Sequence, residues 1–136
     1  MEEEVLHVKR PFFQAMLAHL QANYPLEACG LLAGTANQAR HWYAIDNRLA
    51  SPVAYEMEPR QQLQAMLDLE AQGWEMVAIV HSHPAGPERP SPTDIAQAYY
   101  PDCVYVIVSL ADRSQPVVRG FRIENGRFHE IRINVE

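Results

Sequence analysis

The sequence predicts an α/β (α+β) domain, in which a mixed β-sheet carries packed helices. Segments with apolar residues at helical spacing alternate with strand-like segments, and three more strand-like segments end the chain. Residues 74–80 (WEMVAIV) are apolar at nearly every position, which is typical of a central strand covered on both faces. The length of 136 residues and the 48% apolar content suit one globular domain, residues 1–136.

The first segments predict a strand and an amphipathic helix. Residues 5–8 form the strand, and Pro11 suits the first turn of the helix, where a missing backbone N–H is tolerated. Asn23 and Pro25 end the helix. Its apolar positions recur at helical spacing and are Phe12, Phe13, Met16, Leu17 and Leu20.

A hairpin and a second helix are predicted next. Residues 28–33 (ACGLLA) and 39–47 (ARHWYAIDN) suit two antiparallel strands joined by a short turn. Residues 59–72 suit a helix, which Gly73 closes in the place of a C-cap. The large apolar residues of this helix are Leu63, Met66, Leu67 and Leu69.

Four strands are predicted in the second half of the chain. Residues 74–80 lead directly into His81. Residues 103–110, 116–123 and 127–133 follow as strands, separated by the turn-rich segments ADRSQ and ENG.

The charge and the hydropathy of the chain exclude two classes of partner. The chain has 11 basic and 17 acidic residues, a formal charge of −6 and no basic cluster, so the footprint of a nucleic-acid binder is missing. The N-terminus MEEEVLHVKR is acidic where a signal peptide would be basic, and no apolar stretch approaches the roughly 20 residues that cross a bilayer. We therefore expect a soluble, cytoplasmic protein with no nucleic-acid and no membrane partner.

The two cysteines, Cys29 and Cys103, lie in apolar segments and lack CxxC spacing. This pattern excludes a disulfide framework and a cysteine-only zinc site. We expect both cysteines to be buried free thiols.

Two histidines one residue apart, His81 and His83, are the strongest candidates for metal ligands. Residues i and i+2 point to the same face only in an extended chain, and Pro84 biases His83 toward an extended conformation. Both imidazoles would then point at one ion such as zinc. The isolated histidines His7, His19, His41 and His129 are given structural roles.

A catalytic zinc site usually takes three protein ligands, and Asp94 is the nearest candidate for the third. The proline-rich loop of residues 84–90 could fold it back over the strand end. The segment SPTD is also a helix start, with Ser91 as N-cap, Pro92 at the first position and Asp94 at the third. The two interpretations are compatible, because a helix start also holds a ligand rigidly. Glu27 is a candidate base for a metal-bound water, but the residues alone favour an ordinary surface glutamate.

Taken together, these residues resemble the complete signature of the JAMM (MPN-plus) metalloproteases. The resemblance consists of Glu27, then His81-Ser82-His83-Pro84, then Ser91 after the seven residues 84–90, and Asp94 after two further residues. The segments PLEACGLLAG and YEMEPRQQLQAM are similar to the minimal bacterial and archaeal members, so the resemblance covers about residues 5–110.

The resemblance implies a fold and a reaction. The fold would be similar to that of the cytidine deaminases, a curved sheet with helices on both sides. The reaction would be zinc-dependent hydrolysis of an amide or isopeptide bond, with His81, His83 and Asp94 as zinc ligands. Glu27 would be the general base, and Ser91 would stabilise the oxyanion.

The resemblance also implies the substrate class. Substrates of the family are ubiquitin-like proteins and, in bacteria and archaea, sulfur carriers of the ThiS and MoaD type that end in Gly-Gly. The chain is too short for the long insertions of the deubiquitinating members, so we expect a minimal enzyme with an open site. An exposed strand edge in a domain this small could support a homodimer.

Two other functions are considered. One is a non-catalytic binding or scaffold module of the MPN type, with a structural zinc closed by Cys29 or Cys103, although closed sites usually show paired cysteines. The other is a nucleoside-deaminase-like hydrolase, but the His-x-Glu and Pro-Cys-x-x-Cys motifs of those enzymes are missing, as is the HExxH of the thermolysin type.

Overall fold

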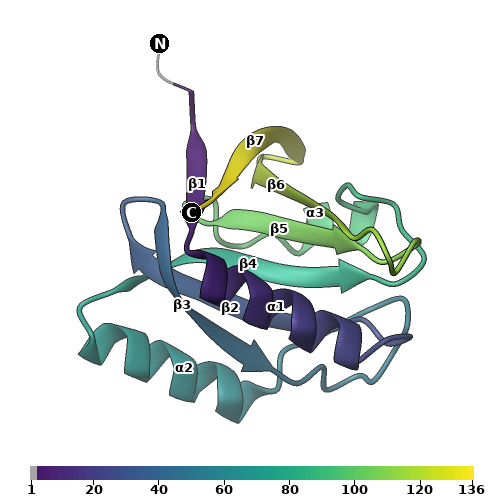
Figure 1. Ribbon diagram of the computed structural model, residues 1–136, viewed down its shortest axis with the longest axis horizontal. Coiled ribbons are helices and arrows are strands. Elements are labelled where there is room, and N and C mark those ends of the chain that lie inside the picture. The colour runs from purple at the N-terminus through teal and green to yellow at the C-terminus, as the bar shows by residue number, and fades with distance from the viewer. Residues whose placement is uncertain (1–2) are drawn as a thin grey trace.

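A computed structural model describes residues 3–136, so Met1 and Glu2 of the expected domain lie outside the described residues. The described chain contains seven strands and three helices (Figure 1). They are β1 (Val5–Val8), α1 (Arg10–Ala22), β2 (Cys29–Thr35), β3 (Gln38–Ile45), α2 (Pro59–Ala71), β4 (Glu75–His83), α3 (Pro92–Ala96), β5 (Val104–Ser109), β6 (Val117–Glu124) and β7 (Arg127–Val135).

The strands form one curved sheet that closes into a barrel, in the order β1-β3-β2-β4-β5-β6-β7. Strands β4 and β5 are parallel, and β1 is parallel to both β3 and β7, whereas the other neighbours are antiparallel. The prediction of a mixed curved sheet is therefore confirmed. The closure was not predicted, because it depends on β1 pairing with two strands that are distant in sequence.

Helices cover both faces of the sheet, as expected. Helix α1 crosses in front of β2, β3 and β4 in Figure 1, and it buries Met16 and Leu20 in one core cluster with alternate residues of the central strands. The opposite face of those strands forms a second cluster with Ala65 of α2. Along β4, Val80 belongs to the first cluster and Ile79 to the second, as the two-residue period of a strand requires.

Helix α2 ends at Ala71, and the predicted Gly73 follows the C-cap Gln72 with a φ of 75°, which suits a residue after a helix C-terminus. Its buried residues are Ala65 and Leu69. Leu63 and Leu67 are 58% and 53% exposed, so two of the leucines that indicated this helix do not contribute to the core.

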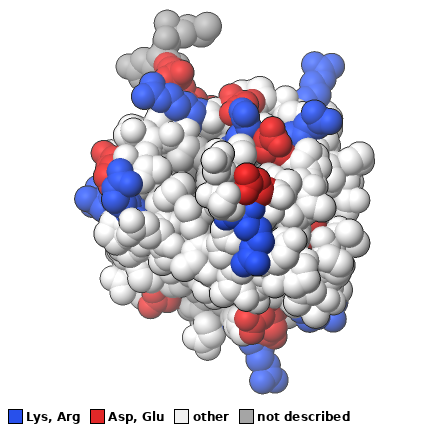
Figure 2. All heavy atoms as spheres, turned by 45° about the vertical axis from the view of Figure 1, so that its right-hand side comes forward, with Lys and Arg blue, Asp and Glu red and all other residues white. Residues whose placement is uncertain are grey.

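Charged side chains are scattered over the face drawn in Figure 2, where acidic and basic residues lie next to one another and broad uncharged areas separate them. Exposed ion pairs of this kind, such as Arg119 with Glu130, contribute little to stability. None of the helices in residues 3–136 has the length and apolar character needed to span a membrane.

Gly34 lies at the irregularity in the pairing of β2 with β3, where the two backbones approach closely. A Cβ atom at this position would collide with the backbone carbonyl oxygen of Gln38, which cannot move away as a flexible side chain could. Gly34→Ala is therefore expected to lower the free energy of unfolding by about 2–3 kcal/mol, measured by urea denaturation. The exposed Ala44→Ser in β3 serves as control and should stay within about 0.5 kcal/mol. A Gly34→Ala protein as stable as this control would contradict the expected collision.

Candidate metal centre

Strand β4 runs through His83, so the histidines stand on one face of an extended chain, as predicted. Their Nε2 atoms are 3.0 Å apart. Both residues are held by the neighbouring parallel strand β5, where His81 pairs with Ile107 and His83 with Ser109. The two imidazoles therefore converge because the strand continues past its apolar run.

Asp94 meets these histidines from the first turn of α3. Its Oδ1 lies 3.2 Å from Nε2 of His81, and its Oδ2 lies 3.1 Å from Nε2 of His83. The predicted capping box is also present, since Oγ of Ser91 accepts from the Asp94 amide and Oδ2 of Asp94 accepts from the Ser91 amide. Helix start and ligand group thus share the same carboxylate.

The charges of the group favour a bound cation. Burial lowers the pKa of His81. Burial alone would also lower the pKa of His83, but hydrogen bonds to Asp94 and to the Pro87 carbonyl outweigh it and raise that pKa above its usual value. Burial would raise the pKa of Asp94, yet hydrogen bonds from both histidines hold it well below its usual range. An ionised carboxylate beside two imidazoles could hold a metal ion, and His81, His83 and Asp94 are close enough to share one.

Glu27 lies just before β2 and is buried, with only 7% of its surface exposed. Its backbone amide donates to the Ser51 carbonyl, and its own carbonyl accepts from the side-chain amide of Asn47. The next amide, of Ala28, donates to Oγ of Ser82 at 2.9 Å. Burial raises the pKa of Glu27 from 4.5 to about 7, while the nearby His83 lowers it in part. A buried carboxyl with a pKa near neutrality is unlike the surface glutamate that the residues alone favoured.

The raised pKa of Glu27 predicts a pH-dependent stability. In metal-free protein this carboxyl stabilises the fold below its ordinary pKa of 4.5, and the contribution is lost as pH rises through about 7. Glu27→Gln removes the ionisable group, so the Tm of the variant minus that of wild type should grow by about 2–5 °C between pH 5 and pH 8. Thermal unfolding with a chelator present checks this, and a difference that does not change with pH would contradict it.

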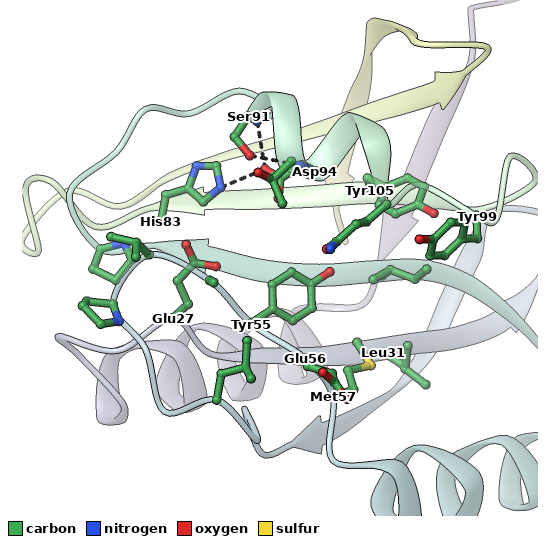
Figure 3. Close-up of a pocket in the computed structure, with 18 of the residues that line it drawn as sticks. Glu27, Leu31, Tyr55, Glu56, Met57, His83, Ser91, Asp94, Tyr99 and Tyr105 are labelled. Carbon is green, nitrogen blue, oxygen red and sulfur yellow. Dashed lines mark hydrogen bonds and ion pairs between the residues drawn. The ribbon is translucent and has the colours of Figure 1, made fainter.

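A cleft of about 600 Å³ runs from this cluster across the sheet. Figure 3 shows Glu27, His83, Ser91 and Asp94 at one end and Tyr99 and Tyr105 at the other, with Tyr55 between them. Leu31 and Met57 line the far end as well. The cleft is therefore polar and ionisable at one end and apolar and aromatic at the other.

The cysteines lie outside the cluster, in the second core cluster. Both are free and buried, as expected. The Cys29 thiol donates to the Ile45 carbonyl and the Cys103 thiol to the Met76 carbonyl. Burial raises their pKa values to about 12 and about 11, which disfavours the thiolate form that a metal needs.

Three residues beside the site, Ser82, Asn47 and Tyr55, were given no role of their own from the sequence, although Ser82 and Tyr55 lie in segments that carry the family resemblance. Ser82 points away from the histidines on either side of it and anchors Ala28, and a hydroxyl inside an apolar strand was the one available signal. Asn47 and Tyr55 belong to the loop of residues 47–57, which is distant in sequence from the histidines. Their places depend on how that loop folds back.

Comparisons with known protein sequences all point to one family. The family described as prokaryotic homologs of the JAB domain matches residues 9–124. The CysO-cysteine peptidase of Mycobacterium tuberculosis is 35% identical over 133 residues, which are 96% of this chain and 91% of that protein. A probable TtuB-protein conjugate cleaving protease of Thermus thermophilus is 40% identical over 95 residues, 69% of this chain and 64% of that protein.

Two solved structures have the same fold as this chain. The solution structure of a Desulfitobacterium hafniense protein superposes with a TM-score of 0.87 at 36% identity, over 98% of this chain and 93% of that one. A JAB1/MPN domain protein from Archaeoglobus fulgidus gives a TM-score of 0.60 at 18% identity, over 95% and 97% of the two chains, and supports the fold alone.

Proposed function

Because the chain belongs to the family of prokaryotic homologs of the JAB domain and is a peptidase of the JAMM type, we propose that it hydrolyses the amide bond after the C-terminal Gly-Gly of a ubiquitin-like or sulfur-carrier protein. The carrier would be of the ThiS or MoaD type. The observation that carries the proposal is the convergence of His81, His83 and Asp94 beside the buried Glu27, at the end of an open cleft. Two relatives support the substrate class: one is a CysO-cysteine peptidase, and the other is a probable protease that cleaves TtuB-protein conjugates.

Zinc is the proposed metal, held by His81, His83 and Asp94. Two imidazole nitrogens and one carboxylate are ligand types that zinc takes in catalytic sites, where a fourth position stays open. Nδ1 of His83 donates to the Pro87 carbonyl at 2.7 Å, which fixes the tautomer that leaves Nε2 free to bind a metal. Zinc bound there supplies a Lewis acid that polarises the scissile carbonyl and lowers the pKa of water.

Glu27 and Ser91 are the proposed catalytic residues. The Glu27 carboxylate takes a proton from the attacking water and returns it to the leaving amine as the C–N bond breaks, so a carboxylate and an amine are released. The Oγ of Ser91 accepts a hydrogen bond from the Asp94 amide, which leaves the hydroxyl hydrogen to donate to the oxyanion. Both residues line the same end of the cleft.

A diglycine tail suits this cleft because it carries no side chain where the cleft passes between Glu27 and Ser91 (Figure 3). Apolar side chains further along an extended tail could contact Leu31, Met57 and Tyr105 at the far end. Glycine beside the scissile bond and apolar residues beyond it is therefore the proposed substrate pattern.

The cytoplasmic location and the homodimer expected from the sequence are part of this proposal. A dimer through a strand edge would use β3 beyond Ala39, because β1 pairs with β3 only at Gln38 and Ala39. Light scattering during gel filtration tests it: a mass of two chains supports the dimer, and a mass of one chain excludes it.

The function is tested with sulfur-carrier proteins that bear a short peptide, a cysteine or an isopeptide-linked lysine after Gly-Gly. Each is incubated with zinc-loaded protein and analysed by mass spectrometry. Loss of the extension directly after Gly-Gly, abolished by a chelator and restored by zinc, is the expected result. Carriers ending in Ala-Ala are the matched control and should stay intact. No cleavage of any substrate by fully zinc-loaded protein would overturn the proposal.

A further inference from the structure

The rings of the two histidines in the cluster, His81 and His83, differ in the hydrogen bonds that hold them. A histidine that binds a metal through one nitrogen almost always donates its other N–H to a fixed acceptor, which sets the ring orientation. His83 follows this rule through the Pro87 carbonyl. His81 does not, since its Nδ1 is buried and makes no hydrogen bond to any protein atom of residues 3–136. The Nδ1 side of the His81 ring therefore lacks the fixed acceptor that His83 has.

Tyr55 contacts the His81 ring instead. Its ring stacks on the His81 ring, with the centroids 4.5 Å apart and the planes inclined by 25°. Stacking of this closeness restricts rotation of the imidazole about its side-chain bonds. A tyrosine phenol, with an ordinary pKa of about 10, is neutral near pH 7, so Tyr55 acts through its ring and not through a charge.

The loop that carries Tyr55 is held by the side chain of Asn47. The amide nitrogen of Asn47 donates to the carbonyls of Glu27 and Ala54, at 2.9 and 3.0 Å. Its amide oxygen accepts from the backbone amides of Leu49 and Glu56, both at 3.1 Å. One side chain therefore ties both sides of Tyr55 to the segment of Glu27.

We propose that Tyr55 is the positioning residue of His81, replacing the missing hydrogen bond at Nδ1, and that Asn47 keeps the Tyr55 ring in place. The inference rests on the metal site of the proposed function and adds the residues that set its affinity. The His81 ring must lose rotational freedom when it binds zinc, and the stacked Tyr55 removes that freedom beforehand. Loss of the ring should therefore weaken zinc binding even though no ligand atom is changed.

Zinc affinity, measured by competition with a chromophoric chelator, tests the inference without any substrate. Tyr55→Leu should bind zinc about 10–100-fold more weakly than wild type, as other losses of a ligand's support do. Tyr55→Phe keeps the ring and should stay within about threefold. Asn47→Asp keeps the acceptor oxygen but loses both donors, so it should weaken binding in the same direction as Tyr55→Leu.

Tyr99→Leu is the matched control, because Tyr99 lines the far end of the same cleft and is 75% exposed. Its zinc affinity should equal that of wild type. Circular dichroism of the metal-free variants verifies that each is folded, and hydrogen exchange should show faster exchange in residues 47–57 of Asn47→Asp alone.

Wild-type affinity in folded Tyr55→Leu would overturn the inference. Equal loss in Tyr55→Phe and Tyr55→Leu would also overturn it, because the hydroxyl would then be responsible. If wild type binds no zinc, the metal site of the proposed function fails and the inference fails with it. If wild type binds zinc but cleaves no carrier, the proposed function fails while the affinities still decide the role of Tyr55.

Discussion

Glu27→Gln is expected to lower kcat/KM for a cleavable carrier conjugate by a factor of about 10³, which is the size of effect that general bases commonly have. Glutamine has nearly the shape of glutamate and keeps the backbone bonds that hold residue 27 to Ser51 and Asn47. It cannot take a proton from water at neutral pH. The loss should therefore fall on kcat, whereas zinc stoichiometry and KM stay close to those of wild type.

The control for this variant is Glu56→Gln. Glu56 also lines the cleft, but its side chain is 50% exposed and pairs with Arg48. Its kcat/KM should change by less than about twofold, because exposed ion pairs contribute little. A Glu27→Gln enzyme with more than a tenth of the wild-type kcat would show that another group is the base.

His83→Ala should remove both the metal and the activity. Only two of the three proposed ligands, His81 and Asp94, would remain, and the pairing that keeps Asp94 ionised would be weakened. Zinc per chain, measured by atomic emission after dialysis, should fall from about one to below about 0.1, because catalytic zinc sites use three protein ligands. Cleavage of every substrate should be lost with the metal.

His129→Ala provides the matched histidine control. The side chain of His129 on β7 is 70% exposed, and His129 is not one of the three residues that could share the metal ion. This variant should keep full zinc content and activity. Full zinc content in folded His83→Ala would instead mean that the metal is bound elsewhere.

The local elements could be predicted because each depends on neighbours in sequence. Pro11 and Gly73 marked one end of each long helix, and the apolar run before His81 marked the central strand. Closure of the barrel could not be predicted, since four residues of β1 gain two parallel partners only after the rest of the sheet exists. The exposure of Leu63 similarly depends on which side of α2 meets the sheet.

The residues of the candidate site also differ in whether their places depend on neighbours in sequence or on distant segments. The meeting of His81, His83 and Asp94 could be predicted, because the period of a strand aligns the two histidines and a proline-rich loop separates His83 from Asp94 by only 11 positions in the sequence. The role of Glu27 could be predicted only from the family resemblance, because its burial depends on strands and a loop that are distant in sequence. The role of Tyr55 could not be predicted for the same reason, although it begins a segment that carries the resemblance.

The pairing between β2 and β4 fixes one part of the candidate site independently of the loops around it. Cys29 is in register with His81, and the Ser82 amide donates to the Ala28 carbonyl, so the sheet itself spaces Glu27 from the two histidines. Asp94 reaches the same place from the first turn of α3, and Tyr55 reaches it from the loop of residues 47–57. We expect substitutions around Asp94 and Tyr55 to change how firmly a metal is held, whereas the β2–β4 pairing keeps the distance between Glu27 and the two histidines. Metal affinity and the placement of Glu27 should therefore respond to substitutions in different segments of the chain.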